Sequence, residues 1–349
     1  MEELLQAEKG SKIYGCERKG TYGEGSGQQK EGAVMEIVRF ERQHMEEARA
    51  LAFANYCEER QAVADLPKMD DVPDLDEFAE NGLGVAAFEG GRMLGFLCYL
   101  APWENAFGSS VAGTFSPIHA HGAVADKRAL IYRRMYQCAA DMLVKKRILY
   151  HTIALYEHDT DAIRAWFGNG FGHRCVDAIR KMEEIGGIVP AEGITYEEIP
   201  PQEAFLVREL RRKLSEHMGE SSCFMYTKAD RFEEWVKQRE SNGDRIFVAR
   251  EEEKIIAFME LSDSAENFVT EHPSMKNICG AYCLPEYRGK NIFQNLLNYV
   301  ILILNRERTL YLGVDYESMN PTAYYFWRKY FKPYTCSVTR RIDGGEARC

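Results

Sequence analysis

The sequence predicts an α/β (α+β) protein made of two tandem copies of one fold, each a mixed, mainly antiparallel sheet flanked by helices. Short apolar segments typical of strands alternate with longer segments whose apolar residues recur at helical spacing. The same order of segments occurs on both sides of a Gly- and Pro-rich connection at residues 185–193. With 349 residues, the chain is long enough for two domains with cores of their own.

The first copy is expected over residues 35–184. A strand at residues 35–40, a helix at 45–56 and a hairpin at 84–100 open it, and Gly90 and Gly91 mark the hairpin turn. A strand at 114–124, a helix at 131–144, a strand at 151–156, a helix at 162–167 and a closing strand at 171–182 follow. Residues 1–34 are rich in Gly, Lys, Glu and Gln, so we expect a disordered leader there.

The second copy is expected over residues 194–349, after the linker at 185–193. A strand at 194–199, a helix at 201–218 and a hairpin at 246–261 repeat the opening elements. A strand at 278–284, a helix from residue 291, a strand at 310–315 and a helix at 320–331 complete it. The best internal match lies between residues 159–167 and 320–328, where Ala and Trp occur at the same offsets. We expect Trp166 and Trp327 to be packing residues, because indoles usually anchor cores.

Residues 286–290, here called the basic turn, are the most informative stretch for function. Pro285 cannot donate to a sheet ladder and ends the preceding strand. Gly289 then lies between Arg288 and Lys290, directly before a helix. The unpaired N–H groups and the dipole of a helix start attract anions, so the turn suits a phosphate or diphosphate. A solvated loop would show the same pattern, and the turn alone does not decide between the two.

The basic turn resembles the coenzyme-binding motif of the GCN5-related N-acetyltransferases (GNAT), which is Pro-x-Tyr-Arg-Gly-x-Gly-x-Gly/Ala. This chain matches at Pro285, Tyr287, Arg288 and Gly289 and departs at Asn291 and Phe293. The resemblance implies that acetyl-CoA is the acyl donor and that backbone groups of the turn and of the preceding strand hold it. The binding residues implied are Ala281, Tyr282, Cys283, Arg288, Gly289, Lys290, Asn291, Ile292, Phe293 and Asn320.

A second family motif, Asn-x-x-Ala-x-x-x-Tyr, is matched at Asn320 and Ala323. Trp327 replaces its Tyr, which in the family often protonates the leaving thiolate, and an indole does not give up its proton near neutral pH. Tyr324 lies on the same helix face and could take that role. Asn320 and Pro321 also form a good helix start.

The implied function is an acyl-CoA-dependent N-acyltransferase that moves an acetyl group to a primary amine of a small acceptor by direct attack. The amide of Cys283 or Leu284 would hold the oxyanion. The candidate general bases are Glu260 and Asp315, with Glu317 as a competing carboxylate.

The corresponding turn of the first copy, residues 123–129, contains no Gly and carries Asp126. We therefore expect the first copy to be degenerate and not to bind the coenzyme. This leaves a second hypothesis, a catalytically silent binding or scaffold protein of the same fold. A third and weaker hypothesis is a metal site at His119 and His121, which share one face of a strand without further ligands at suitable spacing, so no metal is expected.

The composition narrows the partners and the compartment. A formal net charge of −10 disfavours nucleic acid and anionic membranes as partners. Ten Cys without a Cys-x-x-Cys pair and no recognisable secretion signal favour reduced thiols in the cytoplasm. The longest apolar run, residues 300–304, is too short to span a membrane. The acceptor amine and the choice between monomer and homodimer stay open; the loops at 57–78 and 218–232 would set specificity.

Overall fold

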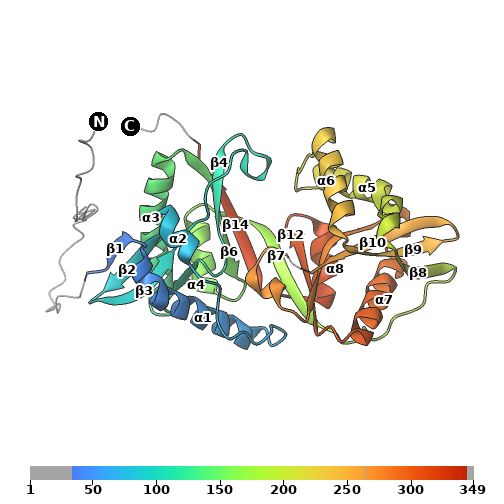
Figure 1. Cartoon of the computed structure of the whole chain (residues 1–349), viewed down its shortest axis with the longest axis horizontal. Coiled ribbons are helices and arrows are strands. Elements are labelled where there is room, and N and C mark those ends of the chain that lie inside the picture. The colour runs from blue at the N-terminus through green and yellow to red at the C-terminus, as the bar shows by residue number, and fades with distance from the viewer. Residues whose placement is uncertain (1–33, 264, 344–349) are drawn as a thin grey trace.

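The computed structural model describes residues 34–263 and 265–343. The predicted disordered leader therefore lies, except for Val34, outside the described residues. Strands, most of them antiparallel, form one sheet of four strands and one of ten, and helices flank both sheets. This confirms the predicted fold class. Figure 1 shows the first half of the chain on the left and the second half on the right, with β14, β7 and β12 crossing the middle.

The elements of the first half follow the predicted order, with one short helix added. Its strands are β1 (Glu36–Arg39), β2 (Val85–Glu89), β3 (Arg92–Leu97), β4 (Ala112–Ser116), β5 (His121–Ala123), β6 (Ile148–Tyr156) and β7 (Gly172–Lys181). Its helices are α1 (Met45–Ala62), α2 (Asp76–Asn81), α3 (Arg128–Lys145) and α4 (Thr160–Gly168). Trp166 of α4 is buried against Tyr136 and Phe171, so its predicted packing role is confirmed.

The second half repeats that order. Its strands are β8 (Ile194–Ile199), β9 (Arg245–Glu251), β10 (Lys254–Ser262), β11 (Met275–Cys283), β12 (Tyr311–Glu317), β13 (Lys332–Pro333) and β14 (Thr335–Arg341). Its helices are α5 (Arg208–Glu220), α6 (Ala229–Asn242), α7 (Ile292–Arg306) and α8 (Pro321–Tyr330). The apolar stripe of α7 is buried as its spacing predicts, and Trp327 of α8 is buried as well.

The two halves exchange their last strands. β14, from the end of the chain, pairs with β6 and with β7, and so lies in the sheet of the first half. β7, from the first half, pairs along its length with β12 of the second half. The periodicity of a strand does not name its neighbour, so this connection was not visible in the sequence.

The predicted single strand at residues 114–124 is two strands. β4 pairs in parallel with β6, whereas β5 pairs with β3. Ser116 ends β4 immediately before Pro117, because proline has no N–H for the ladder. The first half thus contains a place where one chain segment leaves one neighbour for another.

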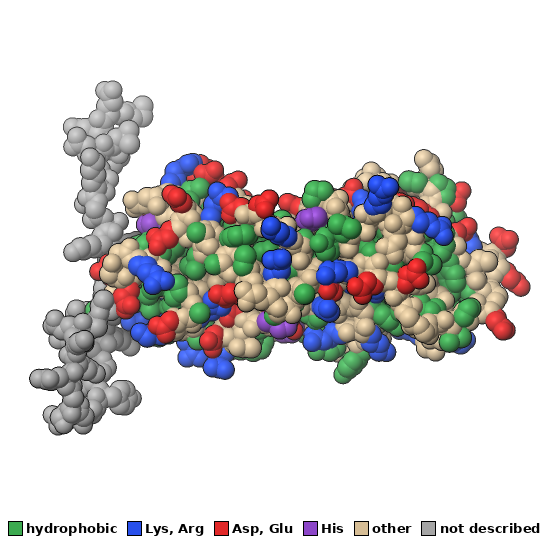
Figure 2. Space-filling view, turned by 90° about the horizontal axis from the view of Figure 1, so that it is seen from below, with side chains coloured by type: hydrophobic (Ala, Val, Ile, Leu, Met, Phe, Trp, Pro, Cys, Tyr) green, Lys and Arg blue, Asp and Glu red, His purple; other side chains and the backbone are tan. Residues whose placement is uncertain are grey.

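Charge is distributed over the surface rather than gathered. Figure 2 shows acidic and basic side chains interspersed over the face that it draws, without a continuous area of either sign. In the described part of the chain, no helix has both the length and the apolar character needed to cross a membrane.

Candidate functional site

The candidate site lies where two strands of the second half diverge. β11 and β12 run in parallel from the pair Met275–Tyr311 to the pair Ile278–Val314. Beyond that point β11 continues beside β10 alone, and β12 continues beside β7. The edge of β11 that faces away from β10 is therefore unpaired near Ala281.

The amide of Cys283 faces this divergence. The N–H of Leu284 donates to the carbonyl of Ile256 at 3.0 Å. Successive residues of an antiparallel strand direct their backbone groups to opposite sides, so Leu284 and Tyr282 face β10 while Cys283 and Ala281 face away from it. Of the two amides predicted to hold an oxyanion, that of Leu284 is thus already used, and that of Cys283 remains.

The basic turn leads into α7 through two residues with left-handed backbone. Gly289 has φ 76° and Asn291 has φ 61°. A Cβ on Gly289 would meet nothing within 4 Å, so the turn requires Gly for its conformation and not for space. Within the described chain, the amides of residues 289–294 have no protein acceptor, and the first to find one is that of Asn295, bonded to Asn291 O at 2.9 Å. The unpaired donors expected for an anion site are therefore present.

The side chain of Arg288 folds back onto the end of β11. Its Nε donates to the carbonyl of Cys283 at 3.0 Å, and its guanidinium lies 5.2 Å from the centre of the Tyr282 ring. The turn and the strand end are thus joined by a fixed cation beside the unpaired edge. Tyr287 is held on the other side of the turn, where its hydroxyl donates to Glu251.

Phe293, one of the two departures from the family motif, packs against α8. Its ring centre lies 5.0 Å from that of Phe326 and 6.0 Å from that of Trp327. The ring belongs to an aromatic cluster between α7 and α8, and its amide is among the unpaired ones. The residues present therefore fit a diphosphate-bearing donor through backbone groups, with aromatic rings in place of the family glycine.

The start of α8 forms the opposite wall. The side chain of Asn320 accepts from the N–H of Ala323, so it caps the helix as predicted. Thr322 Oγ1 also donates to Asn320 Oδ1, at 2.7 Å. Tyr324 is half-buried on this helix, with its ring edge-on to Tyr316 at 6.3 Å. Burial raises the pKa of Tyr316 to about 12, so of these two phenols Tyr324 is the one nearer to solvent.

His217 bridges the two walls, and the sequence analysis did not select it. From α5, its Nε2 lies 3.3 Å from Asn320 Oδ1 and 3.2 Å from Thr322 Oγ1, while its ring centre is 6.3 Å from that of Tyr282 on β11. An amide oxygen can only accept, so Nε2 carries the proton and Nδ1 is the basic nitrogen. The only sequence signal was its place beside the loop at residues 218–232.

Glu260 does not face an acceptor. It is fully buried, with Arg211 Nη2 of α5 at 2.8 Å and Arg239 Nε of α6 at 3.2 Å from its Oε1. This burial contradicts the expectation that Glu260 lines the cleft. An acid that interrupts an apolar strand was interpreted as cleft-facing, whereas it neutralises two guanidiniums that the helices bring beneath the sheet.

Asp315 is the first residue of β12 beyond its pairing with β11. It lies directly opposite Asp177 of β7, so the two carboxyls share one face of the sheet. Burial, and then the neighbouring carboxylates Glu266 and Asp177, raise the pKa of Asp315 to about 8. Burial also raises the pKa of Asp177 to about 6, against hydrogen bonds from Thr335 and Asn267. The pair therefore holds at least one proton at neutral pH.

The competing carboxylate, Glu317, lies two residues further along β12. Its Oε1 is 3.6 Å from Arg174 Nη2, a loose ion pair. Burial raises the pKa of Glu317, and Arg174 opposes that shift. Glu317 is thus paired with a cation, whereas Asp315 faces only other carboxyls.

The corresponding place in the first half is filled by its own side chains. Arg128, at the start of α3, is buried and bonded to Glu58 at 2.8 Å and to Asp159 at 3.0 Å. His121 Nε2 donates to the carbonyl of Ala154 at 2.6 Å, and its Nδ1 accepts from the Tyr132 hydroxyl at 2.9 Å. Both imidazole nitrogens of His121 are thus used within the core. Among the described residues, no group of three or more His, Cys, Asp or Glu is arranged to hold a metal.

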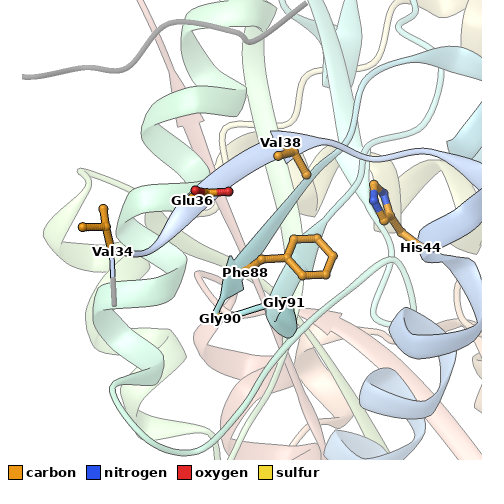
Figure 3. A pocket seen from close by; sticks show the side chains of 7 residues that line it. All are labelled: Val34, Glu36, Val38, His44, Phe88, Gly90 and Gly91. Carbon is orange, nitrogen blue, oxygen red and sulfur yellow. The ribbon is translucent and has the colours of Figure 1, made fainter. Parts of the chain in front are cut away.

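The larger of two surface cavities lies far from this site. It measures about 470 Å³ and is bordered by β1 and the β2–β3 hairpin of the first half. Figure 3 shows the ring of Phe88 and the side chain of His44 facing it, with the paired glycines of the hairpin turn below. It brings together no pair of acid and base suited to catalysis.

Comparison with known proteins identifies the second half. Residues 207–331 match the model of the acetyltransferase (GNAT) family. This segment is a GNAT domain. It includes the diverging strands, the basic turn and most of α8, and its family supports acyl transfer as the general activity.

The fold of the whole chain is also found among solved structures. A GCN5-related N-acetyltransferase from Sphaerobacter thermophilus aligns with 88% of this chain and 95% of its own at 14% identity, with a TM-score of 0.53. A tandem GNAT protein from the clavulanic acid biosynthesis pathway aligns with 90% of this chain and 100% of its own at 13% identity, with a TM-score of 0.46. At such identities the first likeness shows the fold alone. No curated protein matches the chain.

Proposed function

We propose that this protein is an N-acetyltransferase that moves the acetyl group of acetyl-CoA to a primary amine of a small acceptor by direct attack. The observation that carries the proposal is the row of unpaired amides at residues 289–294 beside the unpaired edge of β11. Unpaired donors at the start of a 15-residue helix attract a diphosphate, and an unpaired strand edge suits the amides of a pantetheine arm. The GNAT domain supplies both in one place.

Each donor-side residue has a role in this proposal. The donor supplies an activated thioester. Gly289, Lys290, Asn291, Ile292 and Phe293 bind its diphosphate through their amides, and Arg288 adds positive charge. Ala281, Tyr282 and Cys283 form the strand that the arm lies along, with Asn320 at the opposite wall. The amide of Cys283 stabilises the oxyanion, a contribution of about 2.7–4 kcal/mol where single donors have been removed elsewhere.

Asp315 is the proposed proton acceptor for the amine. Its position at the divergence and a pKa of about 8 favour it over Glu260, whose carboxylate is taken up by two arginines. A carboxylate with a raised pKa is the stronger base once it ionises. Tyr324, half-buried at the mouth, is the proposed proton donor to the leaving thiolate. Burial raises the pKa of the Cys283 thiol to about 11, which argues against a thiolate nucleophile.

Calorimetric titration with acetyl-CoA, followed by thiol release over a panel of small amines, tests the proposal. We expect donor binding and a subset of amines that release thiol. The replacement of the family Tyr by Trp327 keeps a second function open, a silent binding protein. Donor binding without release on any amine would support that alternative, and no binding at millimolar donor would reject both.

A further inference from the structure

A second cavity, of about 290 Å³, adjoins the basic turn. One side comes from the linker and the start of β8, and the other from the turn, the start of α7 and the end of β9. Its lining residues are Pro190, Ala191, Glu192, Ile194, Glu251, Tyr287, Lys290 and Ile292. Lys290 and Ile292 also contribute amides to the unpaired row, so the cavity and the proposed diphosphate site share a border.

The linker side of this cavity is fixed to α7 by two asparagines. Asn295 Nδ2 donates to the carbonyl of Val189 at 2.9 Å, and Asn298 Oδ1 accepts the N–H of Ile185 at 3.3 Å. Both side chains lie on the outer face of α7, one turn apart. The segment that joins the two halves of the chain is therefore held at the donor end of the GNAT domain.

The lining suits a flat ring that carries a hydrogen-bond donor. Pro190, Ala191, Ile194 and Ile292 supply apolar surface. Glu192 supplies an acceptor, whereas the Glu251 carboxylate is already used by the Tyr287 hydroxyl. Two ammonium groups, of Lys254 and Lys290, lie 5.3 and 5.4 Å from the Tyr287 ring centre, where they can meet phosphate outside the cavity. The volume is at the lower end for ligand sites, so it fits one end of a coenzyme and not the whole.

We propose that this cavity binds the adenine nucleotide end of the acyl donor and that the linker at residues 185–193 is part of the donor site. The proposal rests on the proposed function. A diphosphate held by residues 289–294 leaves one arm of the donor toward the diverging strands and the other toward the cavity. Glu192 accepts from the exocyclic amine of adenine, and Ala191 contacts the ring.

Ala191→Trp, which fills the cavity, tests this. Its matched control is Gly186→Trp in the same linker, where a Cβ would meet nothing within 4 Å. The ligands are acetyl-CoA, acetyl-pantetheine, which lacks the nucleotide, and adenosine 3′,5′-bisphosphate, which lacks the arm. We expect Ala191→Trp to raise the Kd of acetyl-CoA and of the bisphosphate at least tenfold, to leave that of acetyl-pantetheine within twofold, and the control to change none.

Glu192→Ala is a second variant, at an exposed position that folding does not depend on. We expect a threefold to tenfold rise in the Kd of the same two ligands. Unchanged affinity for acetyl-CoA in both cavity variants overturns the linker proposal while leaving the acetyltransferase proposal intact. If the wild type binds no acetyl-CoA, the proposed function fails, and the bisphosphate alone then decides: binding that Ala191→Trp abolishes supports the cavity, and no binding rejects it.

Discussion

The two halves contain the same backbone feature and fill it differently. In each, a strand leaves one neighbour for another just before a helix: β5 turns to β3 ahead of α3, and β11 stays with β10 ahead of α7. The registers agree, since Gly95 pairs with Ala123 as Ala257 pairs with Cys283. Each helix also follows a residue with left-handed backbone, Lys127 or Asn291.

The connections and the side chains differ. Four residues (124–127) join strand to helix in the first half, against eight (284–291) in the second. In the first half, Arg128 and His121 extend into the gap and find buried partners there. In the second half, Arg288 folds back along its own strand and leaves the amides unpaired. A long turn with one Gly thus keeps open what a short turn and two polar side chains close.

The largest expected effect is on donor binding. Arg288→Ala combined with Gly289→Asp removes a cation and puts a negative charge at a backbone with φ 76° that disfavours Asp. We expect a loss of about 4 kcal/mol, roughly a thousandfold in the Kd of acetyl-CoA by titration. Asp126→Gly in the first half is the control and should leave the Kd unchanged. Equal effects at the two turns would place the donor in the wrong half.

Breaking the closed gap should cost stability and not binding. Arg128→Ala leaves Asp159 without its main cation in a buried setting. We expect the free energy of unfolding to fall by about 3 kcal/mol in urea titrations. The Kd of acetyl-CoA, measured below the unfolding transition, should not change. A weakened Kd without loss of stability would contradict the structural role of this half.

Asp315→Asn should lower turnover by about a hundredfold, the usual contribution of a general base. In the wild type, turnover should rise with pH through about 8, where Asp315 ionises, and the variant should lose that rise. The folded protein retains this proton at pH values where an unfolded carboxyl has lost it, so wild-type stability falls as pH increases toward 8. Asp315→Asn should remove that fall, which thermal unfolding at pH 6 and 9 would measure. An unchanged rate profile would return the role of base to another group.

Tyr324→Phe is expected to have the smallest effect. We expect turnover to fall about tenfold, because water at the mouth can protonate the thiolate in place of the phenol. The alkaline limb of the rate profile should move with the loss of this group. Turnover that is unchanged across that limb would exclude Tyr324 as the acid.

Part of the site followed from local sequence. The Gly289 turn, the end of the strand near Pro285 and the cap at Asn320 depend on backbone preferences of a few neighbouring residues, which a sequence displays directly. Glu260 was misplaced because a carboxylate in a strand is defined by what faces it. The facing arginines, Arg211 and Arg239, belong to two helices, of which the second was not predicted.

The sequence by itself determined the order of strands and helices, the repeat of that order and the turn where a donor would bind. Periodicity, capping and proline act within a few residues, so they are legible without a fold. Only the tertiary structure decided that β14 lies between β6 and β7, that His217 spans the walls of the site and that the linker borders the basic turn. These contacts join segments far apart in the chain, and only the packing of the two halves brings them together.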